Sequence, residues 1–476
     1  MRYTDYLRWG VLIALFAVLF VPFVVSDGGA SWAARPLSYI PFVNTFFPFI
    51  TGKNFIFRIL VEAALLCYVL LALKAPQYRP RASTVLWAAT FFVAWMGVAT
   101  FFGVEPIKSF WSNFERMEGY VGLLHLYVFF LVAGAMFSVD KLWDRFLTTS
   151  VGASAVMGLL ALLQIMGALP ISSQSGSRAD TTFGNATYLA VYMLFHFFLT
   201  LYLLSREKVS RGMQALYGIA LVLQAMGIYY TQTRGAVLGL IGGLIVAALY
   251  VALRGREYPT LRRWAFGGLA AIVVLVGAFF ALRNTALVQG SETLRRLSEI
   301  SLADRTTESR FIIWGMAAQG ALERPILGWG QENFSFVFNK YYDPRMYNQE
   351  AWFDRAHNQF LDWLVAGGLP AFILYISLYI LAAWAILRST LLLPQQAALI
   401  GLLCGYAFNN MFVFDNLGSA IFFFALLSYA HSLSRKELPS SVAFTKPLSD
   451  HAVAIAAPIA AVAVLAAGWA LNGPGL

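Results

Sequence analysis

One histidine of this chain stands where it could act as a base. His357 lies in the stretch DRAHNQFLDWL, which leads into a long apolar run, and we predict that it is the only one of the five histidines in an outer loop. An imidazole titrates near neutral pH and can take a proton from an attacking hydroxyl. If the stretch is helical, Asp354, His357 and Asn358 share a face, and Asp354 can orient the ring. The alternative is an ordinary interfacial histidine at a helix start.

Two arginines predict an anion site. Arg234 opens an apolar run in TQTRGAVLGL, and Arg310 lies near the start of SRFIIWGM. A helix N-terminus carries positive partial charge, so a cation there is unfavourable unless an anion is close, and a phosphate resolves the conflict. Gly235 lets such a ligand approach the backbone. The alternatives are an Arg234 that snorkels to lipid headgroups and an exposed Arg310 paired with neighbours such as Glu308.

Two further polar stretches, SFWSNFERMEGY and GSRADTTFGNATYLA, supply weaker candidates for substrate binding. They are Arg116, Arg178 and Asn185, and Asn358 beside His357 joins them. Helix caps and interfacial anchors are the ordinary roles of such residues. Zinc-spaced Cys and His, HExxH, P-loop, GxSxG and outer DxD patterns are all missing from the sequence, so we expect neither a metal nor a cofactor.

The composition defines the class of fold. The chain is 59% apolar and 12% charged, whereas soluble proteins carry about 25% charge. We therefore predict an all-α polytopic membrane protein that forms a single integral membrane domain over 1–476, with about 12 to 13 transmembrane helices. The expected spans are 9–25, 54–73, 84–102, 120–138, 146–168, 186–204, 214–230, 235–253, 264–282, 363–387, 393–412, 417–433 and 452–471.

The basic residues of the short loops set the orientation. With the N-terminus in the cytoplasm, the inner segments hold 18 Lys and Arg residues and the short outer segments hold 7. Basic inner loops explain the net charge of +10, so no nucleic-acid partner is expected. The long loop 283–358 then faces outward. Within it we predict an amphipathic helix on the membrane surface, starting at Thr306 or Thr307 and ended by Pro325, with an apolar stripe that includes Phe311 and Leu322.

The order of four motifs resembles the O-antigen ligase superfamily, which comprises lipid A-core O-antigen ligases, Wzy-type polymerases and bacterial O-oligosaccharyltransferases. The motifs are TFGNATYLAVYM, TQTRGAVLGL, SRFIIWGMAAQGALERPILGWGQENF and DRAHNQFLDWLVAGGLPAF, and they span a ligase-like core at about 180–375. Members of this superfamily are similar in having about a dozen spans, a large periplasmic loop and a GT-C-like fold.

The resemblance implies a glycosyltransferase in the bacterial inner membrane with its active site on the periplasmic face. A glycan would move from polyprenyl (undecaprenyl) diphosphate to an acceptor hydroxyl, with inversion and without a metal. Carried over by motif, Arg234 and Arg310 would contact the donor diphosphate, and His357 would be catalytic. Arg295 and Arg305 are close enough in the sequence to replace Arg310 in this role.

The acceptor stays open among lipid A-core, a growing glycan and a protein, with the lipid A-core taken first. A transporter of polyprenyl-linked glycans or small solutes is the alternative without chemistry. Transporters place ionisable groups near the bilayer midplane. The polar residues here gather instead at one end of the spans, which favours the enzyme.

Overall fold

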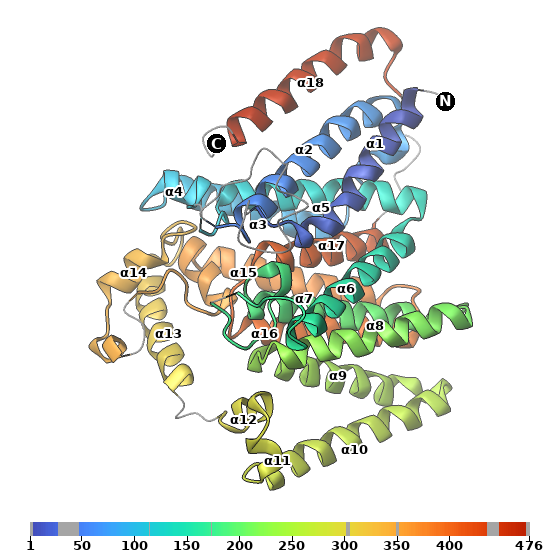
Figure 1. Cartoon of the computed structure of the whole chain (residues 1–476). Helices are drawn as coiled ribbons and strands as arrows, with labels where there is room; N and C mark the ends of the chain where they lie inside the picture. Colours follow the sequence, from blue (N-terminus) through green and yellow to red (C-terminus); the bar gives the residue numbers. More distant parts are fainter. Residues whose placement is uncertain are drawn as a thin grey trace.

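The molecule is built from helices alone in every part of the chain that the structure describes (Figure 1). The computed structural model describes residues 3–26, 47–113, 115–172, 174–300, 305–348, 352–435 and 447–472. The predicted all-α polytopic membrane fold is confirmed. The helices of the first half are α1 Tyr3–Ala17, η1 Val18–Phe23, α2 Thr51–Lys74, η3 Pro76–Tyr78, α3 Thr84–Phe101, α4 Pro106–Trp111, α5 Tyr120–Asp140, α6 Trp143–Ile165, η4 Thr181–Phe183, α7 Ala186–Leu204 and α8 Arg211–Tyr230.

The second half contains the last spans and the helices of the long loop. Its elements are α9 Arg234–Arg254, η5 Gly255–Glu257, α10 Pro259–Leu282, α11 Ala286–Gln289, α12 Glu292–Ser298, α13 Arg305–Glu323, α14 Phe334–Lys340, η6 Pro344–Asn348, α15 Gln359–Leu387, α16 Leu393–Asn410, α17 Leu417–Ser434 and α18 Asp450–Asn472. Among the described residues, twelve helices are long and apolar enough to cross a membrane. They correspond to twelve of the thirteen predicted spans.

The remaining predicted span, 393–412, corresponds to α16, a helix of 18 residues that is less apolar than the other twelve. It packs tightly on α9, because a Cβ at Gly239 would lie 2.7 Å from the Gly405 carbonyl oxygen and one at Gly401 would lie 2.7 Å from that of Gly243. The chain enters α16 just after the end of α15. It leaves near the start of α15, where the Asp415 amide donates to Gln359 Oε1 at 2.7 Å. α16 therefore runs the length of the bundle, as a crossing helix does.

Helix α15 is broken at Gly367 and Gly368, where the backbone leaves helical geometry. The break frees carbonyl groups, and the PILGWG segment after α13 bonds to them. The Trp329 amide donates to Val365 O at 2.8 Å, and the Gly330 amide donates to Ala366 O at 2.9 Å. These bonds tie the extramembrane part of the chain to a span, close to the start of α15.

The long-loop helix α13 runs from Arg305 to Glu323. It ends before Pro325 as predicted, but it begins earlier than predicted, so that Thr306 and Thr307 lie inside its first turn and do not cap it. The predicted apolar stripe lies on its exposed side, with Phe311 51% and Leu322 80% exposed. A second stripe that includes Ile313 and Met316 is buried in a small core with α14. The helix is thus held by protein on one face and presents an apolar face on the other.

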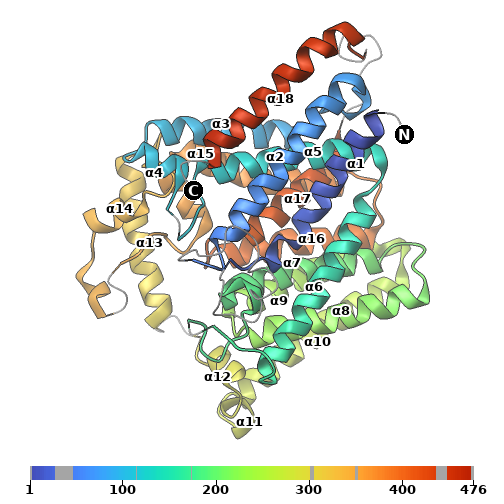
Figure 2. The ribbon, with the colours of Figure 1, turned by 45° about the horizontal axis from the view of Figure 1, so that its top comes forward.

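Two helices lie at the edges of the bundle. α18 packs beside α2 on one side of the bundle, and α10 packs beside α9 on the opposite side (Figures 1 and 2). α18 buries no residue, and α10 buries only Ala265. Apolar helices with so little protein around them are suited to contact lipid directly. The buried core lies between them, around α5, α7, α15, α16 and α17.

Candidate active site

His357 lies in a short non-helical segment just before α15. Its φ of 52° is left-handed, which is uncommon for a residue with a side chain. Asn358 caps the helix, since its Oδ1 accepts from the amides of Phe360 at 3.0 Å and Leu361 at 3.2 Å. The helix therefore begins after His357. The prediction that Asp354 and His357 share a helical face is wrong, because α15 starts only after the capping Asn358 and both residues precede it.

Two carboxylates hold this segment on either side of the histidine. Asp354 forms a two-point ion pair with Arg116, with Nε to Oδ2 at 2.7 Å and Nη2 to Oδ1 at 3.1 Å. Asp362, in the first turn of α15, accepts from the Ala356 amide at 2.7 Å. Asp354 is thus engaged with Arg116 and positions the segment instead of the imidazole. Arg116 also donates to the hydroxyl of Tyr188 at 3.3 Å.

The imidazole of His357 sits between two aromatic rings. Its centroid lies 5.2 Å from Phe353 and 5.2 Å from Phe414, and both rings are nearly perpendicular to it. Burial, and then the charge of Arg310, lowers the pKa of His357 to about 4. The ring is therefore neutral at pH 7 and can accept a proton. Nδ1 lies 3.4 Å from the Arg355 carbonyl oxygen, so a proton on Nδ1 leaves Nε2 as the basic atom.

The turn between α16 and α17, residues 411–416, joins the predicted site residues. The guanidinium of Arg310 lies 5.9 Å from the ring centre of Phe412. The backbone of Gly235, next to Arg234, adjoins the same phenylalanine, since a Cβ there would lie 3.9 Å from Phe412 Cβ. Phe414, two residues on, contacts His357. The start of α9, the start of α13 and the histidine segment thus meet at one turn.

A second group of arginines surrounds the turn between α8 and α9, residues 231–233. Arg178 donates to Thr231 O at 2.8 Å and to Thr233 Oγ1 at 3.0 Å. Arg296 of α12 donates to Gln232 Oε1 at 3.3 Å. Arg234 is the first residue of α9, and its Nη2 lies 3.6 Å from Glu299 Oε2. Burial, and then the charge of Arg296, lowers the pKa of Arg178 to about 10. Positive charge is therefore concentrated at the start of α9.

Two other residues considered from the sequence, Asn185 and Arg295, lie at or near helix ends. Asn185 is exposed and caps α7, where its Oδ1 accepts from the Thr187 amide at 2.8 Å. Arg295 pairs with Glu299 at 3.3 Å and is half exposed. Of the predicted set, the structure brings Arg178 close to Arg234, and Arg116 and Asn358 close to His357. Arg310 lies near His357, since its charge acts on the imidazole.

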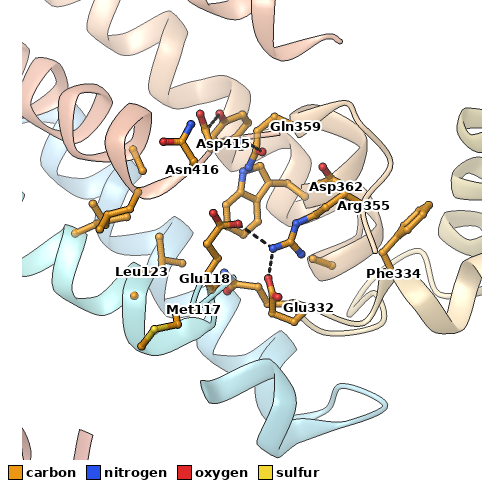
Figure 3. Close-up of a pocket in the computed structure, with 18 of the residues that line it drawn as sticks. Met117, Glu118, Leu123, Glu332, Phe334, Arg355, Gln359, Asp362, Asp415 and Asn416 are labelled. Atoms are coloured by element: carbon orange, nitrogen blue, oxygen red, sulfur yellow. Dashed lines mark hydrogen bonds and ion pairs between the residues drawn. The ribbon is translucent and has the colours of Figure 1, made fainter. Parts of the chain in front are cut away.

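A buried acid cluster lies behind the histidine segment (Figure 3). Arg355 is enclosed by Glu118, with Nη2 to Oε2 at 2.9 Å, and by Glu332, to which the same nitrogen donates. Burial raises the pKa of Glu118 to about 7 against the opposing effect of Arg355. The cluster lines a pocket with an empty volume of about 930 Å³, its open mouth included.

The candidate site residues that the sequence does not predict belong to these contacts. Arg296, Phe412, Phe414 and the partners of Arg355 carry no local motif. The one available signal is the FVFDN stretch, in which two aromatic residues are set among polar ones between two spans. Within the described residues, no group of three or more His, Cys, Asp or Glu residues is arranged to hold a metal ion.

The fold and the site define a multi-pass membrane protein with arginines and a neutral histidine gathered at one end of its helices. Residues 219–376 match the family model described as O-antigen ligase. This match confirms the resemblance to the O-antigen ligase superfamily, covers the last three of the four motifs and gives the chain an O-antigen ligase domain. No curated protein matches the chain significantly. The matched family supports, at a coarse level, an enzyme of glycan transfer.

Proposed function

We propose that the chain moves a glycan from undecaprenyl diphosphate to an acceptor hydroxyl on the periplasmic face of the bacterial inner membrane. The lipid A-core is the acceptor that we propose, and the N-terminus is cytoplasmic. One observation supports this proposal above all: a neutral, partly buried histidine and the arginines at two helix starts meet at the turn 411–416.

The arginines suit the donor half of the reaction. A diphosphate is held well by guanidinium groups and by a helix N-terminus, and Arg234 combines the two. Arg310 of α13 lies at the turn 411–416, which also adjoins the start of α9. Arg178 and Arg296 add positive charge beside Arg234. When the bond between the anomeric carbon and the diphosphate oxygen breaks, negative charge grows on that oxygen. Fixed positive groups lower the energy of this step.

The histidine suits the acceptor half. Nε2 of His357 takes the proton of the acceptor hydroxyl while its oxygen attacks the anomeric carbon from the face opposite the diphosphate. One C–O bond forms, one breaks, and the glycan is transferred with inversion. We propose that no metal takes part, because the arginines supply the positive charge that a metal would bring. A Wzy-type polymerase and a protein O-oligosaccharyltransferase would use the same donor half with a different acceptor.

The proposed reaction can be assayed with purified protein in liposomes. The assay supplies an undecaprenyl-diphosphate-linked glycan and, in separate reactions, lipid A-core, a second glycan and a peptide with hydroxyl side chains. We expect product with lipid A-core and the same yield in excess EDTA. Movement of the donor across the membrane without a new glycosidic bond would instead support a transporter.

Replacing Arg234 by alanine tests the donor site. We expect transfer to fall about 10- to 100-fold, the worth of one charge-assisted hydrogen bond to phosphate, measured as initial rate at low donor concentration. Arg263→Ala, in the predicted inner part of α10, is the matched control and should leave the rate unchanged. An Arg234→Ala variant as fast as the wild type would contradict the donor assignment.

The pH dependence of transfer tests the state of His357. An ordinary histidine has a pKa near 6.5, whereas the folded chain lowers it to about 4. We therefore expect kcat/KM to stay constant from about pH 8 down to about pH 5, and to fall only at lower pH as the base is protonated. Arg310→Gln removes a positive charge near the ring, so its acid limb should move to higher pH. A wild-type limb at or above pH 6.5 would contradict a histidine base whose pKa is lowered.

A further inference from the structure

The pocket of Figure 3 is not lined by Arg178, Arg234, Arg296 or Arg310, and it has two chemically different ends. Its polar residues come from helix starts and the segments before them, and they include Glu118, Arg355 and Asp415. Its apolar residues lie within spans, such as Leu126 of α5 and Phe424 of α17. A pocket of this kind is suited to an amphiphile whose polar group lies at the membrane surface and whose chain points into the bundle.

The wall of this pocket holds polar atoms that lack hydrogen-bond partners. Within the described part of the chain, two buried donors, Trp363 Nε1 and Asn416 Nδ2, bond to nothing. The same holds for three buried acceptors, Asp362 Oδ2, Gln331 Oε1 and Asn333 Oδ1. All five residues line the pocket. Because buried polar groups are almost always hydrogen-bonded, this mixture of donors and acceptors indicates a ligand that both accepts and donates, as hydroxyl groups do.

The charges of the pocket decide what kind of polar group fits. Four carboxyl groups line it, from Glu118, Glu332, Asp362 and Asp415, and Arg355 is the one basic residue of the lining. Arg355 is already bonded to Glu118 and Glu332. A phosphate placed here would meet more carboxyl groups than basic groups, and the one guanidinium is already paired with two of those carboxyl groups. The pocket therefore favours an uncharged group and differs in this from the start of α9.

We propose that this pocket binds the uncharged, hydroxyl-bearing sugar head of a glycolipid, with its hydrocarbon chain along Leu126 and Phe424. The sugar hydroxyls accept from Trp363 and Asn416 and donate to Asp362. Arg355 lies two residues before His357 in the chain, so the pocket adjoins the histidine segment. Binding of this glycolipid does not depend on the proposed function.

The test is photolabelling of the full-length chain in lipid nanodiscs. The probe is dodecyl β-glucoside with a diazirine in its alkyl chain, used below its critical micelle concentration. We expect saturable labelling of α5 and α17, found by mass spectrometry of peptides. Unlabelled dodecyl β-glucoside should compete, and dodecyl phosphate should compete at least tenfold less well. Labelling that does not saturate, or equal competition by dodecyl phosphate, would overturn the proposal.

Trp363→Phe removes the unpaired N–H and keeps an aromatic ring. It breaks no hydrogen bond within the described residues, so thermal stability without ligand should not fall, while competition by dodecyl β-glucoside should weaken about fivefold, the size of one neutral hydrogen bond. Trp143→Phe is the matched control, because its buried Nε1 also lacks a partner but does not line the pocket. Competition should be unchanged in that variant.

A second variant guards against poor folding of the first. Asn416→Asp keeps the oxygen that caps α17 at the amides of Gly418 and Ser419, and replaces only the unpaired donor. We expect a similar loss of competition. Wild-type competition in both variants would overturn the proposal. Normal labelling of a chain that transfers no glycan would contradict the proposed function and leave the pocket assignment intact.

Discussion

His357→Ala is expected to reduce glycan transfer by about 10²- to 10⁴-fold, the usual contribution of a general base. The residue is neutral at pH 7 and lies between two aromatic rings at the turn reached by the arginines. The measurement is the initial rate with undecaprenyl-diphosphate-linked glycan and lipid A-core in liposomes. The protein level of His357→Ala should match that of the wild type, and its melting temperature should fall modestly, because the ring contacts with Phe353 and Phe414 are lost but no strong hydrogen bond is.

The control for this variant is His451→Ala, in the exposed first turn of α18. Transfer should be unchanged there. If His357→Ala retained the wild-type rate in the same membranes, the base would have to be another group, and the proposed mechanism would fail.

Arg355→Leu is expected to cause the largest loss of stability. Removing one partner of a buried ion pair leaves a buried charge without compensation, which costs about 3–5 kcal/mol. Here two carboxylates, Glu118 and Glu332, lose the same partner. The melting temperature in detergent should fall sharply, and Glu118→Gln with Glu332→Gln in the same chain should restore much of it.

The loss of stability in Arg355→Leu should depend on pH in a definite direction. The folded-state pKa of Glu118 is about 7, above the ordinary value near 4.3, and loss of Arg355 raises it further. A raised folded pKa gives stability that is present at low pH and lost as the pH rises through that pKa. The deficit of Arg355→Leu should therefore be smaller at pH 5 than at pH 8. Arg345→Leu, in an exposed pair with Asp343, should change little at either pH.

Local patterns in the sequence were enough for the helices and for part of the site. Run length and hydropathy place the spans, and Pro325 marks the end of α13. Arg234 and His357 could be singled out because a helix start and a lone outer histidine are local features. The start of α15 was harder to predict from the sequence, because whether Asp354 or Asn358 caps the helix depends on which side chain reaches the free amides.

The rest of the site depends on contacts between distant segments. Arg355 and Glu118 are 237 residues apart in the chain, so no spacing rule connects them. Phe412 and Phe414 read as ordinary aromatics of a short turn, and their role is seen only when α13, α9 and the histidine segment pack around that turn. Arg296 likewise meets Gln232 only through the fold of the long loop.

The most direct test of the account is to measure donor binding and transfer separately in two variants. Binding of undecaprenyl-diphosphate-linked glycan to the purified chain in nanodiscs can be followed beside the rate of transfer. His357→Ala should bind the donor with the wild-type Kd and transfer almost nothing, whereas Arg234→Ala should bind it about 10- to 100-fold more weakly. A His357→Ala variant that loses donor binding, together with an Arg234→Ala variant that keeps it, would contradict the division of roles proposed for the site.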